Sequence, residues 1–184
     1  MAVNVAANPE SQVFLFLSEL LGRKVVDGEG RPVGSILDLT GNIGDIYPPV
    51  TDILLRLKEG RKVVLFPWRK IEAVDGTLVA NSPLPEDFRE PVLRHGELLL
   101  KDALLDKQVV DTDGAKIRRV NDLQFLQSKK ILYLVHVDVG FHGLLRRVGL
   151  MKPVGFLLRK LFDYDMADQL IAWRFVQPLS SPDL

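Results

Sequence analysis

Histidine and aspartate residues late in the chain are the first residues whose types and spacing could do chemistry. His136, Asp138 and His142 are spaced so that two imidazoles and a carboxylate could approach one metal ion. The alternative is that one histidine lies on a strand and the other lies where an inserted segment begins. We favour this alternative, so these three residues are the only metal candidates, and we predict no cofactor.

Acidic residues elsewhere give two further patterns. Asp38, Asp45 and Asp52 could offer oxygen ligands to magnesium, but spacings of seven residues across glycine and proline do not define a site. We interpret them as solvated acids in loops. Asp111 and Asp113 match the start of a calcium-binding loop whose later glycine and glutamate are missing, which favours an ordinary turn.

Signatures of the common enzyme classes are missing from the sequence. There is no cysteine, no G-x-S-x-G motif, and no serine with an evident base. The glycines at 28, 30 and 34 precede no expected helix and no GK[ST] sequence, so they do not form a phosphate-binding loop. We therefore predict a protein that is not an enzyme and has no catalytic residues.

Composition narrows the class of protein further. The 184 residues include 24 Lys+Arg and 24 Asp+Glu, and the zero net charge argues against a nucleic-acid partner bound through a global positive field. Apolar runs such as 13–17 are far shorter than the roughly 20 residues of a membrane-spanning helix. The first ten residues contain no cation, unlike a secretory signal. We expect a cytoplasmic protein, with the inner face of the membrane as a further option.

An internal repeat determines the expected fold. Residues 20–39 and 104–123 are related by an offset of 84, and eight of the twenty positions are identical. The identical pairs are Leu20/Leu104, Leu21/Leu105, Val25/Val109, Val26/Val110, Asp27/Asp111, Gly30/Gly114, Asp38/Asp122 and Leu39/Leu123. Trp68-Arg69 also has a counterpart, Trp173-Arg174, at an offset of 105. We predict a structural role for both tryptophans, with each arginine packing or pairing nearby.

Each copy of the repeat predicts short strands. β-Branched runs flank Asp/Gly turns at 27–30 and 111–114, and residues 52–57 and 62–66 form a second hairpin pattern. The expected fold is all-β with a small helical insertion: two tandem small barrels, each with its own core.

The expected domains follow from this pattern. They are a disordered N-terminus (1–11), a first barrel (12–80), a proline-rich linker (81–95), a second barrel (96–179) and a C-terminal linker stub (180–184).

The repeating unit resembles the PRC-barrel, a β module found in the photosynthetic reaction centre and in a ribosome-maturation factor. The residues that carry the resemblance are LGRKVVDGEGRPVG at 21–34 followed by Ile36-Leu37-Asp38. The second copy is weaker, because Arg118 stands where the first has Gly34. The resemblance implies a PRC-barrel-like fold and an adaptor role without catalytic residues.

A narrower resemblance involves residues 138–149 and 172–179, which are similar to the tandem PRC region of MgtE-like magnesium-transporter proteins. In such proteins the barrels precede an acidic helical domain and a CBS pair. The resemblance therefore implies that this chain is the front portion of a longer protein, with those domains of its own chain as partners. Magnesium is then expected as a cofactor of the full-length protein only.

A basic segment at about 140–165 interrupts the second copy. From Phe141 to Phe162 it carries five cations and no acid, with apolar residues at helical spacing on both sides of Pro153. One interpretation is a helical cap over an open barrel end, and the other is docking to an acidic partner domain or an anionic membrane surface. The expected docking residues are Arg146, Arg147, Lys152, Phe156, Arg159 and Lys160.

These observations together favour one function. We expect a non-enzymatic interaction and regulatory module, the cytosolic portion of a magnesium-transport-associated protein, docking through the basic segment. A homodimer is a further option. The alternative is a ribosome-assembly adaptor of the ribosome-maturation-factor type, which the barrel permits and the neutral charge disfavours.

Overall fold

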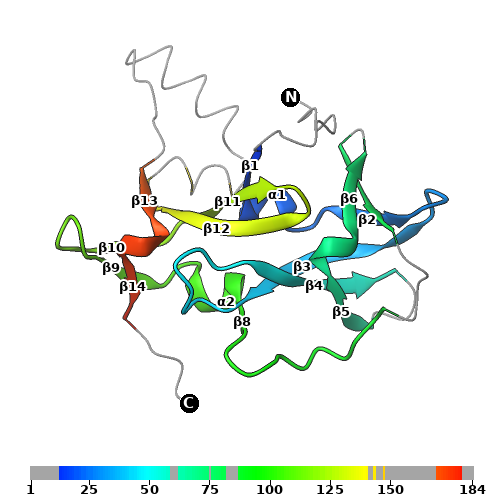
Figure 1. Cartoon of the computed structure of the whole chain (residues 1–184), viewed down its shortest axis with the longest axis horizontal. Coiled ribbons are helices and arrows are strands. Elements are labelled where there is room, and N and C mark those ends of the chain that lie inside the picture. Colours follow the sequence, from blue (N-terminus) through cyan, green and yellow to red (C-terminus); the bar gives the residue numbers. More distant parts are fainter. Residues whose placement is uncertain are drawn as a thin grey trace, which may run out of the picture.

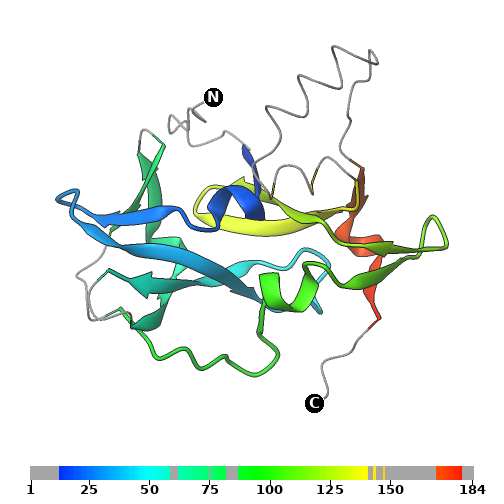
Figure 2. The same cartoon turned by 180° about the vertical axis from the view of Figure 1, so that it is seen from behind.

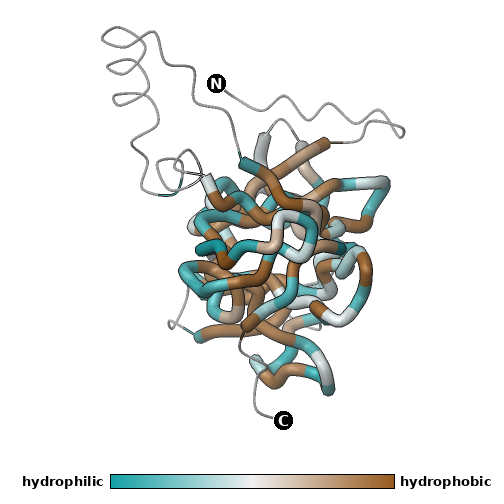
Figure 3. Tube along the Cα trace, turned by 90° about the vertical axis from the view of Figure 1, so that its left-hand side faces the viewer, coloured by the Kyte–Doolittle hydropathy of each residue, from teal (hydrophilic) through white to brown (hydrophobic). Residues whose placement is uncertain are grey.

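The computed structural model describes residues 13–58, 62–74, 76–81, 87–140, 143, 147 and 169–179. These residues form a mostly β structure with a few very short helices, so the prediction of an all-β fold is confirmed at this level (Figure 1). The predicted helical insertion at about 140–165 lies almost entirely outside the described residues. Apolar and hydrophilic stretches alternate along the trace, as expected for strands that bury one face (Figure 3).

The first repeat begins with a strand and a single helical turn and continues as a series of hairpins. Its elements are β1 (Val13–Phe16), α1 (Leu17–Leu20), β2 (Lys24–Asp27), β3 (Pro32–Gly41), β4 (Val50–Leu57), β5 (Val63–Pro67), η1 (Trp68–Lys70), β6 (Ile71–Val74) and β7 (Thr77–Ala80). The predicted hairpins are confirmed, because β2 pairs with β3 and β4 pairs with β5, both antiparallel.

The second repeat follows the same order with two changes. Its elements are β8 (Leu98–Leu99), α2 (Leu100–Leu104), β9 (Gln108–Asp111), β10 (Lys116–Arg119), β11 (Asp122–Ser128), β12 (Ile131–Asp138), β13 (Leu170–Ala172), η2 (Trp173–Phe175) and β14 (Val176–Pro178). The long strand β3 corresponds to two strands, β10 and β11. In addition, β14 pairs directly with β9, whereas β7 lies between β6 and β2 in the first repeat.

The two repeats exchange their leading elements. The first strand, β1, pairs with β11 of the second repeat, and β8 pairs with β3 of the first repeat. The helical turns that follow, α1 and α2, therefore each lie against a strand of the other repeat, and both are in front in Figure 2. Strand pairing consequently crosses between the repeats in both directions.

Three sheets result from this exchange, with strand orders β1-β11-β12-β13, β10-β9-β14 and β5-β4-β3-β2-β7-β6. Each order is an open path among the described residues, so the closed cylinders that the strand lengths suggested are not seen there.

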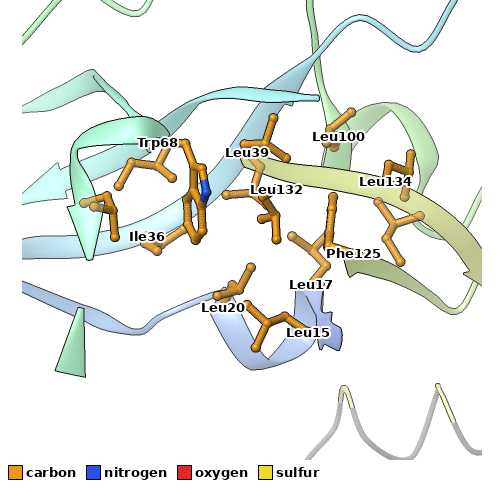
Figure 4. Close-up of a cluster of buried hydrophobic side chains, with 14 of the residues drawn as sticks. Leu15, Leu17, Leu20, Ile36, Leu39, Trp68, Leu100, Phe125, Leu132 and Leu134 are labelled. Carbon is orange, nitrogen blue, oxygen red and sulfur yellow. The ribbon is translucent and has the colours of Figure 1, made fainter. Parts of the chain in front are cut away.

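The core is also continuous between the repeats. Leu15, Leu17, Ile36, Trp68 and Phe125 belong to one cluster of buried side chains (Figure 4). The expectation of two separate cores is therefore wrong. The physical reason is that β1 and α1 bury their apolar side chains on the sheet of the second repeat.

The structure does not test the predictions for the two termini and for the domain boundary between the repeats. Residues 1–11 and 180–184 are not among the described residues, and the predicted domain boundary within 81–95 stays a prediction. Within the described part of the chain, the helices are too short to cross a membrane.

Candidate functional site

Two repeated aspartates bind the short helix of the opposite repeat. The carboxylate of Asp38 accepts hydrogen bonds from the backbone N–H groups of Lys101 (2.8 Å) and Asp102 (3.3 Å). At the equivalent position, the carboxylate of Asp122 accepts bonds from the N–H (3.2 Å) and the hydroxyl (2.6 Å) of Ser18. Each carboxylate also accepts a bond from the N–H of its own following residue. This reciprocal capping fixes one repeat on the other.

Burial sets the acidity of the first of these groups. Asp38 is 2% exposed, and its burial raises the pKa of the carboxyl to about 6, although the N–H groups of Lys101, Leu39 and Asp102 oppose the rise. The interpretation of Asp38 and Asp52 as solvated loop acids is wrong: both lie on strands and are buried. Asp45 is exposed in the loop before β4, as expected.

The buried Asp52 belongs to a network that ties the segment between the repeats to β4. Its Oδ2 accepts hydrogen bonds from the guanidinium groups of Arg89 (2.5 Å) and Arg94 (3.1 Å), and Arg94 also donates to Glu97 (2.8 Å). Burial raises the pKa of Glu97, but hydrogen bonds from Arg94 and Thr51 outweigh it, so the net shift is downward. The network pairs Oδ2 of Asp52 with two cations, while its buried Oδ1 has no hydrogen-bond partner among the described residues.

The candidate metal residues do not act together among the described residues. The ring Nδ1 of His136 lies 2.9 Å from Oε1 of Gln124, and burial lowers the pKa of His136. The carboxylate of Asp138 instead accepts a bond from the N–H of Gly140 (2.8 Å). No cluster of three potential metal-ligating side chains occurs in the described ranges, and His142 lies outside them, so the metal site is untested.

One of the expected docking residues is described. Arg147 forms a two-point ion pair with Asp106, with distances of 3.0 and 3.1 Å, and Arg119 also donates to Asp106 (2.8 Å). Arg147 and Arg119 together lower the pKa of the Asp106 carboxyl. Any docking by Arg147 must compete with this ion pair. The other expected docking residues, Arg146, Lys152, Phe156, Arg159 and Lys160, lie outside the described residues.

The repeated Trp-Arg pairs occupy equivalent places, as predicted. Trp68 and Trp173 each begin a short 3-10 helix, and they are only 2% and 3% exposed. Trp173 donates from Nε1 to the carbonyl oxygen of Asp45 (3.2 Å), in the hairpin loop of the other repeat. Arg174 packs over the ring of Phe175 at 4.6 Å, as expected, but Arg69 is exposed and has no ion pair with a described residue.

Each of these arginines lines a groove where the two repeats meet. The first groove, about 290 Å³, is lined by Val50, Thr51, Asp52, Pro67, Arg69, Arg94, Lys130 and Ile131. The second, about 570 Å³, is lined by Phe14, Tyr47, Leu126, Ser128, Tyr133, Val135, His136, Ala172 and Arg174. Each groove combines the segment around the Trp-Arg arginine of one repeat with the hairpin tip of the other.

The two grooves differ in chemistry although they correspond in position. The first carries three cations, of which Arg94 is paired with Asp52 and Glu97, and Lys130 with Glu72 (2.7 Å). The second is largely apolar and aromatic, with Arg174 and His136 as its cationic and titratable groups. We call the pair together the junction groove.

Sequence reasoning recognised some of this site and missed the rest. Asp38, Asp122 and the two Trp-Arg pairs stood out as repeated residues, which is the signal that could have pointed to them. Their partners carry no such signal, because the exchange of β1 and β8 is visible only in the folded chain.

Comparisons with known proteins add no assignment to this geometry. No protein-family model matches the chain, and no curated protein matches it.

Proposed function

We propose that this chain is a non-enzymatic interaction module built from two interlocked PRC-barrel-like repeats. The observation that carries the proposal is the use of the buried carboxylates. Asp38 and Asp122 cap helices of the opposite repeat, and Asp52 accepts hydrogen bonds from Arg89 and Arg94. Groups that could have been adapted for acid–base chemistry thus hold the repeats and the intervening segment together.

The proposed setting is the cytosolic portion of a magnesium-transport-associated protein of the MgtE-like kind. The resemblance of residues 138–149 and 172–179 supports this setting, and the five cations between Phe141 and Phe162 support docking through the basic segment. The proposed partner is an acidic helical domain of a longer chain, and the full-length protein is where magnesium would act.

A binding measurement with charge variants tests the docking role. The triple variant Arg146→Ser, Arg159→Ser, Lys160→Ser leaves the Arg147–Asp106 ion pair intact and removes three cations of the basic segment. At low salt we expect its affinity for the acidic helical domain of an MgtE-like protein to fall at least about tenfold.

The matched control is the triple variant Lys24→Ser, Lys116→Ser, Lys129→Ser, which removes three exposed cations on other elements. The control should bind as the unmodified chain does. Equal affinity of all three proteins at low salt would rule out docking through the basic segment.

A further inference from the structure

The two halves of the junction groove lie next to each other along β12 and the β3–β4 hairpin. Ile131 lines the first half and Tyr133 the second, and these residues are two apart on β12, so both point to the same side of the strand. Across from them, Val50 and Tyr47 line the first and second halves, and Pro49 forms a β-bridge with Tyr133 between them. In Figure 1 the segments that follow β5 and β13 lie on either side of β12.

The charges along this surface are incompletely neutralised. The structure gives neither Arg69 nor Arg174 an ion pair within its described residues, and both side chains are exposed. The acids nearest the first half, Asp52, Glu97 and Glu72, are already paired with Arg89, Arg94 and Lys130. An incoming carboxylate would therefore meet a guanidinium that makes no ion pair with any described residue.

Apolar side chains next to these cations remain exposed. Phe14 is 52% exposed, Tyr47 is 47% exposed and Ile131 is 43% exposed. Aromatic side chains beside an arginine are the combination enriched at the centres of protein interfaces. The surface thus offers apolar contact area to a partner, and positive charge that is complementary to an acidic group, within a few residues of each other.

We propose that the junction groove binds an acidic peptide segment of a partner protein. A carboxylate of the peptide pairs with Arg69 in the first half, and an apolar side chain packs between Tyr47 and Tyr133 in the second half. Ile131 and Tyr133 are separated by roughly 7 Å along the strand, which matches an acidic and an apolar residue about two positions apart in an extended peptide. This inference rests on the proposed role as an interaction module but uses residues outside the basic segment.

Selection from a display library of random short peptides against the full chain tests this inference. We expect enriched peptides that carry Asp or Glu within a few positions of Leu, Phe or Tyr. Their synthetic versions should lose at least about tenfold in affinity when Arg69→Glu or Tyr47→Ser is introduced. Arg69 and Tyr47 are exposed, and neither is paired in the described part of the chain, so both variants should fold.

Two controls separate this inference from its competitors. Lys116→Glu makes the same charge change on β10, whose sheet supplies no residue that lines the groove, and should leave peptide affinity unchanged. The basic-segment triple variant should also keep its peptide affinity.

Four outcomes would overturn the inference. The first is a library without enriched peptides, and the second is affinity that is insensitive to both Arg69→Glu and Tyr47→Ser. The third is that no peptide is selected but the chain binds phosphatidylserine vesicles, and Arg69→Glu abolishes this binding. That result would mean that the surface binds a membrane. If only the basic-segment variant loses peptide binding, the junction groove is not the peptide-binding site. The proposed function as an interaction module would not be affected by that result.

Discussion

At the scale of single residues, the buried carboxylates show how charge can join two halves of a chain. Asp38 and Asp122 lie at equivalent positions, and each accepts hydrogen bonds from the beginning of a helical turn that belongs to the other repeat. An ionised carboxylate in a buried position is costly unless such donors surround it. The two caps therefore make the exchange of leading elements specific.

Asp38→Asn should remove a pH dependence of stability. Because the pKa of Asp38 is raised to about 6, the folded chain holds this proton more tightly than the unfolded chain. Its contribution to the free energy of unfolding therefore falls as pH rises from about 4 to about 6, by on the order of 3 kcal/mol at about 1.4 kcal/mol per pKa unit.

The measurement is denaturant unfolding of both proteins across this pH range. The difference in stability, unmodified chain minus Asp38→Asn, should decrease through the window and stay flat above it. Taking the difference cancels the acids whose pKa values are lowered, such as Asp27 and Asp106. A difference that does not change with pH would show that the carboxyl titrates normally.

At the scale of elements, one glycine accounts for a difference between the repeats. A Cβ at Gly34 would lie 2.4 Å from the backbone oxygen of Arg56, so the close pairing of β3 with β4 there requires glycine. The second repeat has Arg118 at this position, and its strand is divided into β10 and β11, of which only β11 pairs with β12. A side chain at this position does not fit the close strand pairing that Gly34 makes in the first repeat.

Gly34→Ala should destabilise the protein, whereas Gly28→Ala should not. The added methyl group at 34 must displace backbone, which costs about 1–3 kcal/mol by the usual range for overpacking. At Gly28 an added Cβ meets nothing within 4 Å. Thermal or denaturant unfolding of the two variants measures the difference, and equal stabilities would mean that β4 can shift without cost.

The sequence predicted local elements well and long-range pairing poorly. The hairpins of β2–β3 and β4–β5 follow from β-branched runs and turn residues that are close along the chain. The exchanged strands β1 and β8 pair with strands that are distant along the chain. The local pattern of apolar residues indicates a strand but not which distant strand it pairs with. The groove could not be predicted for the same reason: its two sides, such as Arg69 and Lys130, come from different repeats.

At the scale of the whole molecule, the exchange makes each half depend on the other. Leu17 and Leu20 of α1 are fully buried, and α1 lies against β11 of the second repeat. A repeat on its own would expose these side chains and lose the cap at Asp38 or Asp122.

Separate fragments should therefore be unstable and should recombine. We expect residues 1–84 and residues 85–184, expressed separately, to show no cooperative unfolding transition. Mixing them should restore the β-sheet circular dichroism signal and a single transition. The cut falls within 82–86, outside the described residues, so it removes no described hydrogen bond or ion pair. A fragment that unfolds cooperatively alone would mean that each repeat is an autonomous domain.

The pairing of Val13 with Gln127 also has a consequence for synthesis on the ribosome. β1 emerges from the ribosome more than a hundred residues before its partner, so it must wait while the chain between them is translated. Leu15 and Leu17 are buried in the folded chain. Until β11 has been synthesised, their side chains are exposed and can make non-native contacts. Slow translation past residue 84 would lengthen this vulnerable interval, and binding of a chaperone to the nascent amino-terminal strand would shorten its exposure.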